Sequence, residues 1–382
     1  MTATASEAPP AAATRPPRAQ KGQPLWRRAV FLVPAGVAML AGLDAALMLL
    51  GVPAPISTDR LPAVHGMLLV FGFVGTLIAL ERAVALKHPF GFSAPALLGI
   101  GGLLLICPLP LVVGKAVELG GAVALVGIYI PLWRRQRDDA VLIQAFGAVL
   151  AVGGLTLWLG GLTVPHLLPW LVGFVVLTIG AERLELARLA MGPTAGRNLV
   201  LLSATFVAGV VASLLWPSVG YPLLGLAILV LVGWLATHDV ARRTIHTRGL
   251  TRFMAGCTLA GYFWLAVVGS TWLLGGPAYA GERYDVVVHA VFLGFTLSMI
   301  MAHAPVILPA VLRRPLPYHP VLLVPAVLLH VSLALRLWVG DALGVPFAWQ
   351  AGGILNITAL LLFVALAGWS ATTANRPSRR PR

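Results

Sequence analysis

Histidine, glutamate and arginine recur at a fixed spacing in two apolar stretches of the chain. The stretch HGMLLVFGFVGTLIALER begins at His65 and ends in the pair Glu81 and Arg82. The stretch HLLPWLVGFVVLTIGAER begins 101 positions later, at His166, and ends in the same Glu-Arg pair. Imidazole nitrogens ligate metals and haem iron, whereas buried carboxylates and guanidinium groups form ion pairs or carry protons. The spacing therefore predicts a helix with a metal-binding end and a charged end.

The chain that carries this repeat is very apolar. It has 382 residues, of which 59% are hydrophobic and 10% are charged, whereas a soluble domain carries about 25% charged residues. Long apolar runs between short polar or basic segments indicate an all-α polytopic membrane protein, because helices satisfy their own backbone groups in lipid. We count twelve candidate spans, near 29–51, 62–86, 94–113, 116–133, 140–160, 165–190, 198–216, 219–236, 252–275, 285–312, 319–338 and 346–369.

Basic residues predict how these spans are oriented. The expected membrane domain is 29–370, between a disordered tail at 1–28 and a basic tail at 371–382. With both tails in the cytoplasm, 23 of the 27 Lys and Arg residues lie inside, as the positive-inside rule requires. The four that lie outside are Arg60, Lys115, Arg283 and Arg336. The net charge of +14 therefore reflects topology, and we expect no nucleic-acid partner.

The two stretches fall in spans two and six, so both cross the membrane in the same direction. A period of four spans predicts a third copy in span ten, where HAVFLGFTLSMIMAHAPVILPAVLRR begins at His289. There Gly294 matches the glycine of the other copies, and His303 stands where they have glutamate. The sequence thus predicts three parallel four-helix repeats in a pseudo-threefold arrangement, with spans two, six and ten at the centre. The repeats are 29–133, 140–236 and 252–369.

The histidines of the three copies are candidate ligands. We expect His65, His166 and His289 to lie at similar depth, about one turn below the outer surface, where imidazoles could bind haem or a metal. The alternative is that they make helix–helix hydrogen bonds or lie at the interface, and this alternative weighs most for His166. His303 follows His289 by fourteen residues, which places it on nearly the same helix face but about 21 Å deeper, as a separate candidate ligand.

Charged residues at the other end of the repeat have two interpretations. Glu81 and Glu182 lie sixteen residues beyond their histidines, or about 24 Å along the helix axis, and therefore near the inner face. We expect each glutamate, with Arg82 and Arg183 beside them, to form a clamp in which a basic residue from another part of the chain is the partner. The alternative is a carboxylate that accepts protons from the cytoplasm.

Two further polar residues lie within the spans. Asp44 in span one could orient a histidine ligand from behind, or it could hydrogen-bond to a neighbouring helix. Arg336, at the outer end of span eleven, could pair with an anionic group such as a haem propionate, or its side chain could extend to the outer interface.

The plan resembles subunit I of the haem-copper oxidases, which carries its haem and copper ligands on spans two, six and ten, and it is more similar to the NnrS family. The similarity lies in VHGMLLVFGFVG at Val64–Gly75, HAVFLGFTLSMIMAHAPVILPAVLRRPL at His289–Leu316 and LLHVSLALRL at Leu328–Leu337. It implies a bacterial inner-membrane protein that binds haem and copper and acts in nitric oxide handling or redox stress. It further implies that His65 and His289 are axial ligands of one haem and that His166 binds copper or a second haem.

The chain also departs from the oxidase pattern. Span seven, at 198–216, lacks the adjacent histidines of the oxidases, and span ten lacks their His-x-His pair. Trp170 stands where their span-six tyrosine often lies. These departures argue against a complete oxygen-reducing centre.

Three functions stay open at this point. The first is a haem-binding membrane protein of the NnrS type, which could bind copper and nitric oxide and need not be an enzyme. The second is a twelve-span transporter without haem, because internal repeats are also common in transporters. The third is a structural or assembly protein whose histidines only pack. The visible spectrum of the purified protein separates the first from the other two.

Overall fold

Twelve long apolar helices make up most of the described part of the chain. The computed structural model describes residue 28 and the ranges 30–313 and 315–373, and these contain no β-strand. Twelve helical segments in this part of the chain are long and apolar enough to cross a membrane, which confirms the predicted count. Of the two expected tails, residues 1–27 and 374–382 lie outside the described residues. Large apolar side chains such as Val33, Phe347 and Leu274 are exposed, as expected for a surface that faces lipid.

Eight spans are single α-helices. They are α2 (Leu32–Leu49), α6 (Leu111–Gln136), α7 (Asp139–Leu159), α8 (Val164–Met191), α9 (Ala195–Leu215), α10 (Pro217–His238), α12 (Gly249–Gly275) and α16 (Pro346–Thr373). A short helix, α11 (Ala241–Thr244), lies between spans eight and nine.

The other four spans change helix type along their length. Span two is α3 (Arg60–Met67), η1 (Leu68–Gly75) and α4 (Thr76–Leu86), and span ten is α13 (Gly281–His289), η3 (Ala290–Leu297) and α14 (Ser298–Leu312). Span three is η2 (Pro89–Phe92) and α5 (Ser93–Ile106), and span eleven is η4 (Pro320–Leu322), α15 (Leu323–Ala334) and η5 (Leu335–Ala342). The segments η1, η3 and η5 are π-helical.

The boundary between spans three and four differs from the expected one. The sequence predicts that span three continues to residue 113, but α5 ends at Ile106 and α6 begins at Leu111. Pro108 and Pro110 lie between them. Proline lacks a backbone N–H and disfavours helical geometry in the residue before it, so the two prolines end the third span early.

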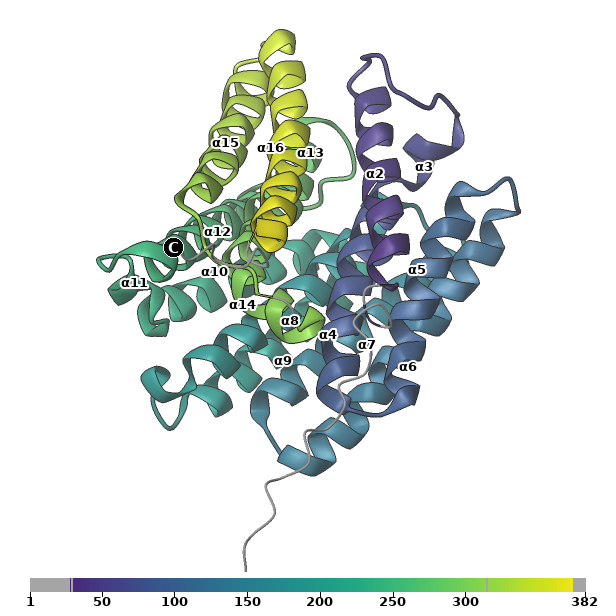
Figure 1. The fold of residues 1–382 in the computed structure, drawn as a ribbon. Helices are drawn as coiled ribbons and strands as arrows, with labels where there is room; N and C mark the ends of the chain where they lie inside the picture. The colour runs from purple at the N-terminus through teal and green to yellow at the C-terminus, as the bar shows by residue number, and fades with distance from the viewer. Residues whose placement is uncertain (1–27, 29, 314, 374–382) are drawn as a thin grey trace, which may run out of the picture.

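Spans two, six and ten are neighbours at the centre of the protein, as predicted. Between 67% and 78% of the most apolar part of each is buried, whereas the other nine spans have 33–56% buried. Helix α8 contacts η3, and α4 contacts α14. The rings of Phe71 in span two and Phe174 in span six stack with their centroids 5.5 Å apart. Figure 1 accordingly shows α8 near the middle of the assembly, with α2 and α5 on one side and α10 and α12 on the other.

The repeated glycine has a packing explanation. In each of the three central spans, a Cβ added to this glycine would come closer than 3.0 Å to a side chain of the preceding span. The pairs are Gly72 with Ala38, Gly173 with Leu150, and Gly294 with Trp264. The glycine therefore lets each central helix approach the helix before it in the chain.

Spans two and ten also share an irregularity. Both η1 and η3 begin four residues before the repeated glycine, Gly72 or Gly294, and end three residues after it. Span six stays α-helical at the equivalent Gly173. A π-helical turn inserts one extra residue into the helix and is frequent at functional sites. The π segments follow His65 by three residues and His289 directly, and the third, η5, contains Arg336.

We expect Gly294→Ala to destabilise the protein, because the new methyl group would lie 2.3 Å from Cγ of Trp264, an atom close to the backbone that cannot swing away. Overpacking of this kind costs about 1–3 kcal/mol, so the thermal unfolding midpoint of the purified protein in detergent should fall by several degrees. Gly180→Ala is the matched control, since a Cβ there meets nothing within 4 Å. Equal unfolding midpoints for the two variants would contradict this account.

Candidate functional site

Polar groups gather near the two ends of the central spans. We call the side where α2 begins and α16 ends the termini face, and the opposite side the far face. His65, His166 and His289 lie toward the far face, and the Glu-Arg pairs lie toward the termini face.

His65 and His289 are held in the same way at the far face. Nδ1 of His65 donates to the carbonyl of Gly42 at 2.8 Å, and Nδ1 of His289 donates to the carbonyl of Asp285 at 3.0 Å. Within the described residues, neither Nε2 makes a hydrogen bond. His65 also lies within electrostatic reach of His289 and Arg336. Each ring therefore leaves Nε2 available to ligate a metal.

An ion pair fixes the surroundings of His289. Nε and one terminal nitrogen of Arg336 each lie 2.8 Å from a carboxylate oxygen of Asp285, and this carboxylate lies 3.1 Å from Nδ1 of His289. The guanidinium also stacks over Trp349, 5.0 Å from the ring centroid. Arg336, for which we expected an anionic partner, thus has one within the protein. Sequence reasoning missed Asp285, although its spacing of four from His289 places the two on one helix face.

Asp44 and His166 do not join this cluster. Asp44 accepts a hydrogen bond from the backbone N–H of Ile56 at 3.3 Å, so it closes the loop after span one, and Gly42 rather than Asp44 orients His65. His166 is exposed. Its ring stacks on Tyr279 at 4.4 Å between centroids, and its Nδ1 lies 3.0 Å from the hydroxyl of Thr163. In the part of the chain that the structure describes, no three His, Cys, Asp or Glu side chains are placed to hold a metal ion.

At the termini face, Arg82 connects spans two, five and six. Its guanidinium pairs with Glu81 and reaches Glu185 at 3.3 Å and the side-chain oxygen of Gln144 at 3.1 Å. The expectation that Glu81 pairs with a basic residue from another part of the chain is wrong, because its partner is the adjacent Arg82. Adjacent residues point apart on a helix, but the long arginine side chain bends back to bridge them.

Arg183 forms a second and more buried network. Two of its nitrogens lie 2.8 and 2.7 Å from the Asp239 carboxylate, and a third lies 2.9 Å from Nε2 of His303. The Tyr262 hydroxyl donates to Asp239 at 2.6 Å. We expected His303 to be a candidate metal ligand. Its Nε2 is instead engaged by Arg183 and is not free to bind a metal. Asp239, which follows span eight, was not predicted from the sequence.

The pKa of Asp239 reflects this network. Burial alone would raise the pKa of this carboxyl, but the hydrogen bonds and charge of Arg183, together with the Tyr262 hydroxyl, lower it below its ordinary value. The lowered pKa means that the ion pair stabilises the folded state at neutral pH.

Glu182 differs from its neighbours. It is only 7% exposed, and within the described residues it makes no hydrogen bond and no ion pair within 4.0 Å. The prediction that a basic residue from another part of the chain pairs with it is therefore wrong. In its helix, the flanking Arg183 and Glu185 are both committed to other partners.

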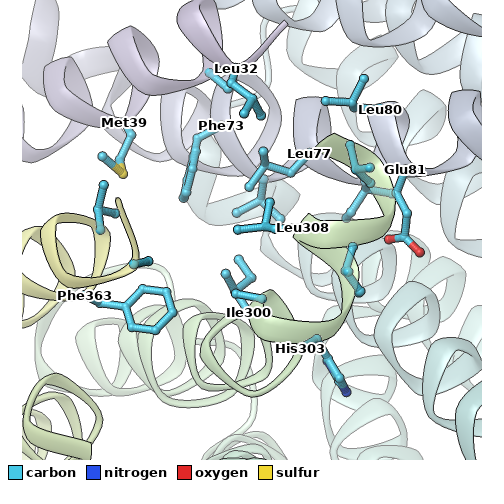
Figure 2. A pocket seen from close by; sticks show the side chains of 18 of the residues that line it. Leu32, Met39, Phe73, Leu77, Leu80, Glu81, Ile300, His303, Leu308 and Phe363 are labelled. Carbon is cyan, nitrogen blue, oxygen red and sulfur yellow. The ribbon is translucent and has the colours of Figure 1, made fainter. Parts of the chain in front are cut away.

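Glu182 lines a cavity that sequence reasoning did not predict. The cavity has a volume of about 470 Å³ and lies between spans one, two, six, ten and twelve. Its walls are almost wholly apolar, and its polar lining residues are Glu81, Glu182, Thr296 and His303. Figure 2 shows Glu81 and His303 on one side of the cavity and Met39 and Phe363 on the other. His65, His166 and His289 are not among the lining residues.

Outside this cavity, His330 is partly buried and Glu118 is fully buried. His330 accepts from the Trp264 indole at 3.0 Å and donates to the Ser298 hydroxyl at 3.1 Å, so both of its nitrogens are satisfied and its role is structural. Glu118 in α6 is fully buried, and neither carboxyl oxygen has a hydrogen-bond partner among the described residues.

We expect Asp239→Asn to lower the thermal unfolding midpoint by several degrees at pH 7, because it leaves the buried Arg183 without its counter-ion. The folded-state pKa lies below the unfolded value of about 3.9. The stabilisation is therefore present above about pH 4 and is lost as the pH falls through the folded-state pKa. The difference in thermal unfolding midpoint between the variant and the wild type should therefore become smaller toward about pH 3.

Asp138→Asn is the control for this prediction. It neutralises a carboxylate whose partner, Arg188, is largely exposed, and asparagine caps a helix as well as aspartate does. Its effect should be small at every pH. A similar loss for both variants would mean that the buried network does not stabilise the fold.

Comparisons with known proteins bear on the family alone. No curated protein and no solved structure matches the chain. The profile of one family, described as a domain of unknown function (DUF8744), matches residues 28–372 and thus covers all twelve spans. The protein therefore belongs to the DUF8744 family.

Proposed function

We propose that the protein is a haem-binding membrane protein in which His65 and His289 are the axial ligands of one haem near the far face. The observation that supports this most is the matched anchoring of the two rings. Each Nδ1 donates to a backbone carbonyl, and each Nε2 is left without a hydrogen bond among the described residues. Histidines that bind metals commonly donate their other ring N–H in this way, which fixes the tautomer and aims the ligating nitrogen.

The surroundings of the two histidines fit a haem. Imidazoles on neighbouring spans are suitable axial ligands, and spans two and ten are in contact through α4 and α14. The π segments next to His65, next to His289 and around Arg336 are the kind of local irregularity that accompanies functional sites. The guanidinium of Arg336 is held at the same end of the protein by Asp285, where it could also attract a propionate. Bound haem would supply redox-active iron.

Copper has less support than haem. His166 is the residue that the resemblance to the haem-copper proteins implies as a copper ligand. Its Nδ1 is engaged by Thr163, and its ring stacks on Tyr279. Within the described ranges it has no second and third ligand around it. We therefore propose haem without assigning a copper site.

The wider assignment follows the similarity to the NnrS family. We propose a role in nitric oxide handling or redox stress in the bacterial inner membrane, with the termini face in the cytoplasm. We also propose that the chain is three parallel four-helix repeats around a pseudo-threefold axis. In support of the repeats, each central span packs its glycine against the span before it, and the π segments of spans two and ten share one register.

A transporter without haem is the second candidate, and the cavity at the termini face favours it. A volume of about 470 Å³ is in the range of small-molecule sites. Pro305 and Pro309 lie inside α14 beside the cavity wall, and each lacks the backbone N–H with which other residues hydrogen-bond within a helix.

We expect protein purified from cells supplied with haem to show a Soret band and a low-spin α band. His65→Ala and His289→Ala should each remove or convert the low-spin spectrum, because each deletes one axial nitrogen. The measurement is the visible absorption spectrum in the reduced and oxidised states, with haem content determined on the same samples.

His319→Ala is the matched control, since this histidine lies at the start of η4, is exposed, and caps that turn. Its spectrum should equal that of the wild type. If the protein binds no haem, or if a double His65→Ala, His289→Ala variant keeps the wild-type bands, the haem assignment fails and the transporter candidate leads.

A further inference from the structure

The cavity at the termini face is a built site that the proposed haem function does not use. Two of its walls come from α2 and α16, the first and last spans, and the rest comes from α4, η1, α8, η3 and α14. Apolar side chains such as Met39, Phe73 and Phe363 form most of its surface (Figure 2). An occupant must therefore be largely apolar.

Unpartnered polar groups also face the cavity. Glu182 is 7% exposed and Thr296 is fully buried, and both line the cavity. Within the described residues, Glu182 makes no hydrogen bond or ion pair, and the Thr296 hydroxyl is unsatisfied. Burying such groups without partners costs free energy. They therefore indicate that a bound ligand supplies the missing partners.

The ionisable groups that line the cavity indicate which sign of charge a ligand should carry. Among the described residues that line the cavity, the ionisable side chains are those of Glu81, Glu182 and His303, and none is a lysine or arginine. Arg82 pairs with Glu81, and Arg183 holds His303. Glu182 is therefore the lining carboxyl group that has no ionic partner within the described residues. Anions are therefore disfavoured.

A small metal ion fits the site poorly. Hard cations need several oxygen ligands, but the cavity lining is almost wholly apolar, and the described residues hold no metal-binding group. A charge carried on an apolar body matches both the walls and the carboxylates.

We propose that this cavity binds a lipophilic organic cation, with its apolar body between α2 and α16 and its charge beside Glu182 and Glu81. This binding goes beyond the haem function and does not depend on it. The cation would bind at the termini face, whereas the histidine pair lies toward the far face.

The test compares two ions of one shape and opposite charge. Binding of tetraphenylphosphonium and tetraphenylborate to the purified full-length protein is measured by equilibrium dialysis, with protein-free detergent micelles as the blank. We expect saturable binding of the cation and binding of the anion weaker by at least about tenfold, the size of one charge-assisted interaction. Glu182→Gln should weaken cation binding by a similar factor, and Glu81→Gln by less, because Arg82 already pairs with Glu81.

Two further variants keep the test independent of folding defects. Glu118→Gln removes a carboxyl group that is more deeply buried than that of Glu182 but does not line the cavity, and it should leave cation binding unchanged. Ala367→Trp fills the cavity from α16 without touching a charge, and it should abolish binding while the protein still elutes as a single species in size-exclusion chromatography. A His65→Ala, His289→Ala variant should bind the cation normally, which separates this proposal from the haem proposal.

Several results would overturn the proposal. They are the absence of saturable cation binding, equal binding of the two ions, or unchanged binding in Glu182→Gln and Ala367→Trp. Binding of a neutral hydroquinone and of neither ion would also overturn it, because Glu182 and Thr296 would then serve a hydrogen-bonding ligand rather than a charge.

Discussion

The cost of burying charge among apolar helices governs this structure. A guanidinium or carboxylate in the membrane needs a partner, and the partner usually has to come from another helix. Arg183 meets this demand with Asp239 and His303, and so ties span six to span ten and to the segment after span eight. Arg82 ties span two to spans five and six through Gln144 and Glu185. The three central helices are therefore joined to one another by arginines at one face, and each packs through its glycine against the span before it.

The two faces of the protein differ in how their buried charged and polar groups are paired. At the termini face, the arginines share several acceptors in branched networks. At the far face, one carboxylate, Asp285, serves both Arg336 and His289, and the rings of His65 and His289 are each anchored on one side only. The first arrangement links several helices through each guanidinium group, whereas the second leaves Nε2 of each ring without a partner among the described residues.

Most of the fold could be predicted from the sequence, but the partners of the polar residues could not. Apolar runs and basic segments indicate twelve spans, and the 101-residue repeat indicates which spans are central. Partner choice depends on which helices become neighbours and on how far a side chain bends, so Asp239 was missed and Glu81 was given the wrong partner. A π segment depends on one extra residue in a helical turn. The apolar residues around Gly72 do not indicate from sequence where such a turn occurs.

The walls of the cavity have a consequence for how the protein is made. Among the spans, α16 leaves the ribosome last, so the cavity lacks the wall that α16 supplies until the end of translation. Until α16 inserts, the carboxylate of Glu182 and the apolar face of α2 must be covered by lipid, water or the insertion machinery. The cavity is thus the last part of the molecule to take shape, and a chain that lacks α16 would contain every ion pair described above yet still have no enclosed cavity.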